Sequence, residues 1–120
     1  MQYGAKISVG GETPQTIDDI LSRLFWKEPE LAGYAKDFLT YVKEWARTDT
    51  PYRVSQLENY FEKTGLTQSR YHNILRRLRR AGIIKKRYNK SVRDHELYLT
   101  DEFSNQLNIM AVVWDDFLKR

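Results

Sequence analysis

Positively charged side chains are concentrated in one part of the chain, where they could bind a polyanion. Between Gly65 and Thr100 there are ten lysines and arginines but two carboxylates, a balance of +8, whereas the whole chain carries +4. Segments 1–64 and 101–120 each carry −2. Solvated surfaces normally mix the two signs, so this separation indicates a polyanionic partner, most commonly nucleic acid. The alternative is a basic face paired with acidic helices, although surface ion pairs contribute only about 0–1 kcal/mol each.

The sequence lacks the side chains that other kinds of chemistry require. The chain has no cysteine, which excludes disulfides, thiolate zinc sites and a cysteine nucleophile. His72 and His95 have no carboxylate pair or second histidine at metal-binding spacing, and we interpret both as surface or DNA-proximal side chains. The sequence contains no glycine-rich phosphate loop and no nucleophile elbow. It therefore predicts no enzyme, no metal site and no cofactor.

Length and composition suit one domain. A chain of 120 residues with 41% hydrophobic content can bury one core. Residues 1–15 contain three glycines and one proline with little periodicity, and we expect a flexible arm there, followed by a single domain over 16–120. No apolar run approaches the roughly 20 residues that span a bilayer, and the first residues lack the apolar core of a signal peptide. We expect no membrane contact and a cytoplasmic, nucleoid-associated protein.

Helical periodicity dominates the first half of the chain. Apolar residues at helical spacing predict one helix after Thr16 and a second from about Glu30 to a break at 48–51. Ser55 and Glu58 match a capping box, which predicts that a third helix begins at Ser55.

A tight turn and a hairpin follow. Gly65 can end the third helix and Thr67 can cap the next one, so a helix-turn-helix is expected over 55–81. In the helix over 67–81, four apolar residues lie within a stripe of about 100° and should face the core. Gly82 then closes this helix, and two strands with polar and basic residues between them are expected over 83–100. A helix-turn-helix followed by a basic hairpin is the element order of a winged helix. The apolar stripe comprises Tyr71, Ile74, Leu75 and Leu78.

The segment Leu66–Ile84 resembles the recognition helix and first wing strand of winged helix-turn-helix transcription factors, of the MarR type and related archaeal regulators. Their pattern is a turn, Thr or Ser, an apolar xxLxxL face, Gly, two aliphatic residues and then basic residues. The segment 97–101 (Leu-Tyr-Leu-Thr-Asp) is similar to their second wing strand. The resemblance covers residues 54–101 and implies a mainly α fold, a winged helix with extra terminal helices. The helix is denser in arginine than is usual in these families, which leaves a weakly selective or architectural binder open.

Position along the predicted helix and wing separates the candidate DNA contacts by role. Side chains at the start of the helix could read base edges, and the helix N-terminus could hold a phosphate. Residues further along the helix could contact phosphates. The wing could enter the minor groove or lie along the DNA backbone, or it could instead be a solubilising sheet edge. Arg79 lies nearer the core margin and is interpreted as structural. The candidates are Thr67, Gln68, Ser69, Arg70 and Asn73 at the start of the helix, Arg76, Arg77 and Arg80 further along it, and Lys86, Arg87, Asn89, Lys90 and Arg93 in the wing.

The last helix, expected over 101–119, carries an apolar seam with heptad-like spacing. This pattern predicts a homodimer joined through this helix, through the helix after Thr16, or through both. The alternative is a helix that packs wholly on its own domain. The seam comprises Phe103, Leu107, Met110, Trp114 and Phe117.

Together these patterns predict a sequence-selective or architectural double-stranded DNA-binding protein, acting as a dimeric transcriptional regulator. Two alternatives remain: a winged helix that serves as a protein-interaction scaffold, and a module that binds RNA or the replication machinery. No pattern indicates a target sequence, a direction of regulation or a small-molecule effector.

Overall fold

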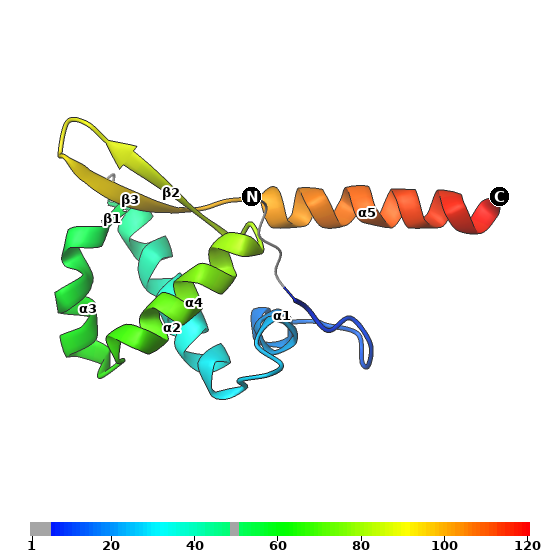
Figure 1. Ribbon diagram of the computed structural model, residues 1–120, viewed down its shortest axis with the longest axis horizontal. Coiled ribbons are helices and arrows are strands. Elements are labelled where there is room, and N and C mark those ends of the chain that lie inside the picture. Colours follow the sequence, from blue (N-terminus) through cyan, green and yellow to red (C-terminus); the bar gives the residue numbers. More distant parts are fainter. Residues whose placement is uncertain (1–5, 49–50) are drawn as a thin grey trace.

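The computed structural model describes residues 6–48 and 51–120 of the chain (Figure 1). It is mostly helical with a small antiparallel sheet of three strands in the order β1-β3-β2, which confirms the expected mainly α composition. Residues 1–5 of the predicted arm, and Asp49 and Thr50 of the predicted break, lie outside the described residues. The elements are α1 (Ile17–Leu24), α2 (Glu30–Ala46), β1 (Tyr52–Arg53), a 3₁₀ turn η1 (Val54–Gln56), α3 (Leu57–Thr64), α4 (Gln68–Arg80), β2 (Ile84–Asn89), β3 (Asp94–Leu99) and α5 (Glu102–Lys119).

An aromatic cluster lies at the centre of the core. The ring of Phe38 on α2 is met edge-on by the rings of Tyr52, Tyr60 and Tyr71, at centroid distances of 5.9, 5.3 and 5.3 Å. Edge-to-face pairs of this kind are favourable beyond the area they bury. The cluster joins α2 to β1, α3 and α4, so it fixes the position of α4 against the rest of the fold.

The start and the buried face of α4 agree with the sequence prediction. The Thr67 hydroxyl accepts a hydrogen bond from the backbone N–H of Arg70 at 3.3 Å, as an N-cap does. Gly65 ends α3 in the left-handed region at φ 67°, a conformation that glycine adopts without strain. The four residues of the expected apolar stripe on α4 are all buried. Local signals therefore determine where α4 begins and which face it buries.

The predicted capping box at Ser55 is wrong. Ser55 lies within η1, and its backbone N–H donates to the Asp94 carboxylate at 3.1 Å, so α3 begins only at Leu57. The pairing of β1 with β3 brings these segments together, because it sets Arg53 opposite Glu96. A capping box is present instead at Thr16, which exchanges hydrogen bonds with Asp19 at the start of α1.

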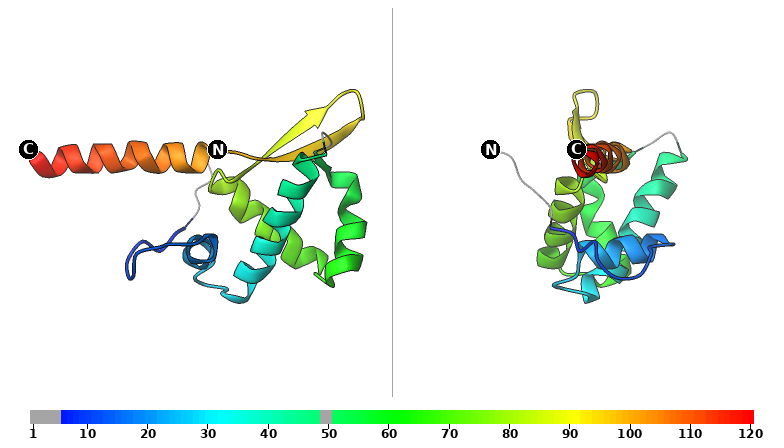
Figure 2. Two further views of the ribbon diagram at one scale, coloured as in Figure 1. Left: turned by 180° about the vertical axis from the view of Figure 1, so that it is seen from behind. Right: turned by 90° about the vertical axis from the view of Figure 1, so that its right-hand side faces the viewer.

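Strand β2 of the hairpin lies beside α4, and β3 lies between β2 and the short strand β1. β2 and β3 occupy almost the predicted positions and pair antiparallel, from Ile84 opposite Leu99 to Asn89 opposite Asp94. The two-residue strand β1 was not predicted, because two residues cannot display an alternating pattern. Figure 2 shows the hairpin extending beyond the helical body.

Residues 6–15 form no helix or strand, yet part of this predicted arm contacts α1. The Arg23 guanidinium donates to the carbonyl oxygens of Ser8 and Gly10, at 3.2 and 3.0 Å, and also to that of Glu12. The backbone N–H of Ser8 donates to the Arg23 carbonyl at 3.0 Å. One arginine therefore holds residues 8–12 against α1.

Helix α5 projects away from the body (Figures 1 and 2). Every residue from Ser104 to Arg120 is exposed, including Trp114 at 58% and Phe117 at 62%. The alternative in which this helix packs wholly on its own domain is therefore wrong. The helix is joined to the body at its base, where the backbone N–H of Phe103 donates to the Gly82 carbonyl at 3.2 Å.

Candidate functional site

A basic groove of about 820 Å³ lies between α4 and β2. Its floor is formed by aliphatic and aromatic residues that belong to the core, including Leu75 and Ile84. Its polar rim carries five cationic side chains and a single carboxylate, that of Glu102. We call this feature the α4–β2 groove. Its polar rim residues are His72, Arg76, Arg79, Arg80, Lys85, Lys86 and Glu102.

The chain turn at Gly82 sets the two walls of the groove side by side. Gly82 adopts φ 81°, and a Cβ atom there would lie 3.3 Å from the backbone nitrogen of Phe103. The turn is closed by the backbone N–H of Ile83, which donates to the Leu78 carbonyl at 3.0 Å. A side chain at position 82 would be strained in this backbone region and would press against Glu102 and Phe103 at the start of α5.

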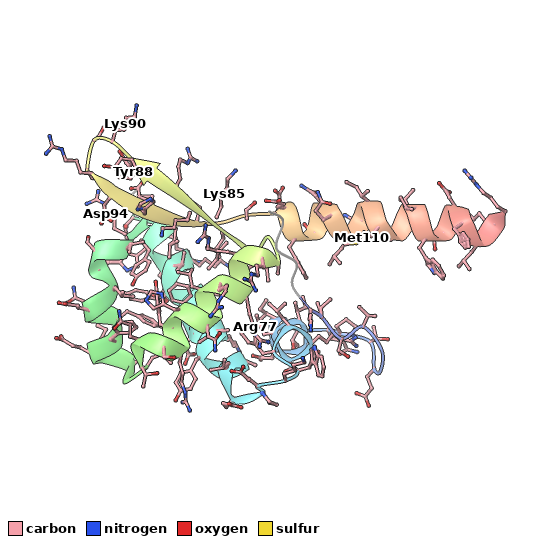
Figure 3. The ribbon with its side chains drawn as sticks, viewed as in Figure 1. Arg77, Lys85, Tyr88, Lys90, Asp94 and Met110 are labelled. Atoms are coloured by element: carbon pink, nitrogen blue, oxygen red, sulfur yellow. The ribbon has the colours of Figure 1, made fainter. Side chains whose placement is uncertain are left out.

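The arginines of α4 point to two different sides of the helix. Arg77 donates to the Leu24 carbonyl at 3.4 Å and to the Glu28 carboxylate at 3.3 Å, and its guanidinium lies 5.4 Å from the centre of the Phe25 ring (Figure 3). Arg70 lies 5.9 Å from the ring of Tyr34 on α2. Both residues were candidate DNA contacts, yet neither lines the α4–β2 groove.

The candidates from the sequence left out four polar residues of the groove: His72, Arg79, Lys85 and Glu102. Arg79 was interpreted as a structural residue at the core margin, but it is exposed and lines the groove. A helical projection places Arg79 beside the core without showing what packs there. β2 lies on that side, so the margin of the isolated helix becomes the wall of the groove. The spacing of His72, Arg76 and Arg79, at intervals of four and three residues, was the available signal.

The remaining candidates on α4 lie outside the groove. Gln68 and Ser69 are exposed in the first turn of the helix. Asn73 is half-buried, and its side-chain oxygen accepts a hydrogen bond from the Arg76 guanidinium at 3.1 Å. Because Asn73 holds Arg76 in this way, the two residues form one polar unit on the outer face of α4.

Buried Glu96 engages two of the candidate wing residues. Its carboxylate is 3% exposed and accepts hydrogen bonds from the Tyr98 hydroxyl at 2.8 Å and the Asn89 amide at 3.1 Å. The Tyr98 hydrogen bond is the main cause that lowers the pKa of Glu96, and it keeps the carboxylate charged. Arg53 lies 3.8 Å from this carboxylate, and the Arg87 guanidinium lies 5.0 Å from the centre of the Tyr98 ring. Arg87 and Asn89 thus lie on the sheet face opposite Lys86, by the alternation of a strand.

The tip of the hairpin carries the last candidates. Lys90 and Arg93 are both exposed, and Lys90 points into solvent at the tip (Figure 3). Arg93 adopts φ 54°, an uncommon conformation for a residue with a side chain. Near the tip the rings of Tyr88 and His95 meet edge-on at 5.1 Å, and Tyr88 is 50% exposed. The tip therefore combines positive charge with an accessible aromatic ring.

The charge of the groove limits the chemistry it can perform. Five cationic groups against one carboxylate favour an anion with several charges, and arginine can bind each phosphate through two parallel hydrogen bonds. Among residues 6–48 and 51–120, no group of three His, Asp or Glu side chains could hold a metal ion. No helix in the described part of the chain is long and apolar enough to cross a membrane.

Comparison with known proteins places the chain in a family. No curated protein and no solved structure matches it. A family model with the description "Archaeal family" matches residues 14–118, a range that includes every helix and strand except the last residue of α5. The chain therefore belongs to this archaeal family.

Proposed function

We propose that this protein binds double-stranded DNA through α4 and the β2–β3 hairpin, and that the segment from β1 to β3 is a winged helix-turn-helix. The observation that carries the proposal is the α4–β2 groove, in which cations from a helix and from a strand border one surface. Cations on two adjacent elements suit the phosphates that flank a DNA groove, because phosphate contacts provide much of the affinity of DNA-binding proteins.

The shape of α4 favours DNA over RNA as the partner. The major groove of B-DNA is about 12 Å wide and admits an α-helix, whereas that of A-form RNA is too narrow for side chains to read. The hydrogen-bonded unit of Asn73 and Arg76 faces outward from α4, in the position that a helix in the major groove would present to DNA. Asparagine can pair with adenine at its base edge.

The proposed roles divide among the described residues. Arg76, Arg79 and Lys86 bind phosphates, and Ser69 and Asn73 read base edges. Lys90 at the hairpin tip contacts the neighbouring backbone or minor groove. With these roles the protein is a transcriptional regulator or an architectural DNA-binding protein, acts as a homodimer and associates with the nucleoid in the cytoplasm.

The test is a salt titration with three nucleic acids. Fluorescence anisotropy would follow the binding of wild-type protein to labelled duplex DNA, duplex RNA of the same sequence, and single-stranded DNA. We expect the tightest binding to duplex DNA, with a logarithm of affinity that falls linearly as the logarithm of salt concentration rises. Equal or tighter binding to RNA would favour the RNA-binding alternative, and no binding to any of the three would refute the proposal. Selection from a random duplex pool would then separate a sequence-selective binder from an architectural one.

A further inference from the structure

Among residues 6–48 and 51–120, nothing covers the second half of the apolar seam of α5. Trp114 and Phe117 lie on one face, with ring centroids 5.7 Å apart, and both are more than half exposed. Exposed aromatic pairs on a projecting helix are costly in water and usually mark an interface.

The first half of the same seam borders a cleft on the body. A cleft of about 240 Å³ is lined by Leu24 and Gly82 of the body together with Phe103, Leu107 and Met110 of α5. Its volume is below the roughly 300–1,000 Å³ that is typical of small-molecule sites, and it suits a side chain better than a cofactor. We call it the α5-base cleft. The first half of the seam therefore lines a cleft, and the second half carries a pair of exposed aromatic side chains.

We propose that two copies of this protein pair through antiparallel α5 helices, with Trp114 and Phe117 of each copy seated at the α5-base cleft of the other. A two-fold axis near Met110 sets Phe117 of the second copy opposite Phe103, because both residues lie seven positions from Met110. The same axis sets Leu107 opposite Val113 of the second copy, and it sets Trp114 of the second copy opposite Gln106, which also lines the α5-base cleft.

Charge along α5 favours the antiparallel direction. Asp101 and Glu102 stand at its start, and Lys119 and Arg120 at its end. The axis near Met110 brings Lys119 of the second copy opposite Asp101, so opposite charges meet at both ends. The helix dipoles are also opposed in this arrangement. Parallel pairing would instead place the adjacent carboxylates at 115 and 116 beside the same carboxylates of the second copy, and it would bring two basic α4–β2 grooves to the same end.

The inference rests on the homodimer of the proposed function, and it specifies the surface through which the two copies pair. Antiparallel pairing holds the two bodies at opposite ends of the paired helices, so their basic grooves lie far apart and could engage separate segments of one duplex. The pairing itself rests on α5 and its base cleft. Its test uses no nucleic acid, so failure of dimerisation and failure of DNA binding are separate results.

The first measurement is the mass of the protein in solution. Sedimentation of wild-type protein at micromolar concentrations should give a species of twice the 14.3 kDa chain mass. Trp114→Glu places a charge in the seam and should give a monomer with unchanged thermal unfolding of the body. The matched control Asn108→Glu adds the same charge on the opposite side of α5 and should remain dimeric. A wild-type monomer would overturn the proposal and assign the seam to a different partner, such as another protein or a lipid surface.

The second measurement determines whether the two α5 helices pair parallel or antiparallel, and it relies on the absence of native cysteine. Met110→Cys lies at the proposed axis and should form a disulfide-linked dimer under mild oxidation. Phe117→Cys should not, because two copies of position 117 would lie about 21 Å apart at 1.5 Å per residue, well beyond disulfide reach. Equally fast cross-linking of both variants would show a parallel pair and overturn the proposal, even if the protein is a dimer.

Discussion

Neutralising the α4–β2 groove should reduce the salt dependence of DNA binding. The perturbation is the triple variant Arg76→Ala, Arg79→Ala and Lys86→Ala. All three side chains line the groove, and none belongs to the hydrophobic core. Two come from α4 and one from β2, so the variant removes cations from both walls while leaving buried residues intact.

The expected magnitude follows from counterion release. Each phosphate contact contributes about 0.9 to the slope of log affinity against log salt, so three lost contacts should flatten the slope by about 2.7. If the non-electrostatic part of binding is unchanged, affinity at 0.1 M salt should fall by roughly 500-fold, since the electrostatic part vanishes near 1 M salt. Thermal unfolding should change little, because exposed and half-buried cations contribute little to folding.

A matched variant separates local contacts from overall charge. Lys27→Ala, Lys43→Ala and Arg47→Ala remove the same three charges from exposed positions outside the groove. Fluorescence anisotropy with one labelled duplex at four or more salt concentrations would give both slopes. The control should keep the wild-type slope to within about one unit. Equal flattening by the two variants would refute the groove as the binding surface, because only net charge would then matter.

Three further results are expected. Ser69→Ala and Asn73→Ala should alter which sequences are selected from a random duplex pool more than they alter overall affinity, and identical selected sites with uniformly weaker binding would assign base reading to other residues. Tyr60→Phe should leave the free energy of unfolding unchanged or raise it by up to about 1 kcal/mol, because the buried hydroxyl has no hydrogen-bond partner among the described residues; denaturant unfolding would reveal any loss that contradicts this. Burial raises the pKa of Tyr71 to about 12, so the contribution of Tyr71 to stability should be complete below pH 10 and be lost as the pH rises toward 12, by about 1 kcal/mol at pH 11. Unfolding measured at several alkaline pH values would test this, and a free energy of unfolding that stays level between pH 9 and 11 would contradict it.

Much of α4 could be predicted from the sequence because its determinants are local. The cap at Thr67, the turn at Gly65 and the apolar stripe each act within a few residues along the chain, and each was found where it was expected. The hairpin strands could be predicted for the same reason. Ser55 was misread because the hydrogen bond that decides its conformation comes from Asp94, 39 residues away.

The composition of the groove depended on contacts between distant segments. The sequence alone determined that cations gather between 65 and 100, because charge is a property of residue type. It could not determine which arginines of α4 remain available. Arg77 binds Glu28, which lies 49 residues earlier in the chain, whereas Arg79 lines the groove beside β2. Both residues have similar positions at the edge of an isolated helix. The packing of α1 on one side of α4 and of β2 on the other separates their roles, and only the tertiary structure contains that information.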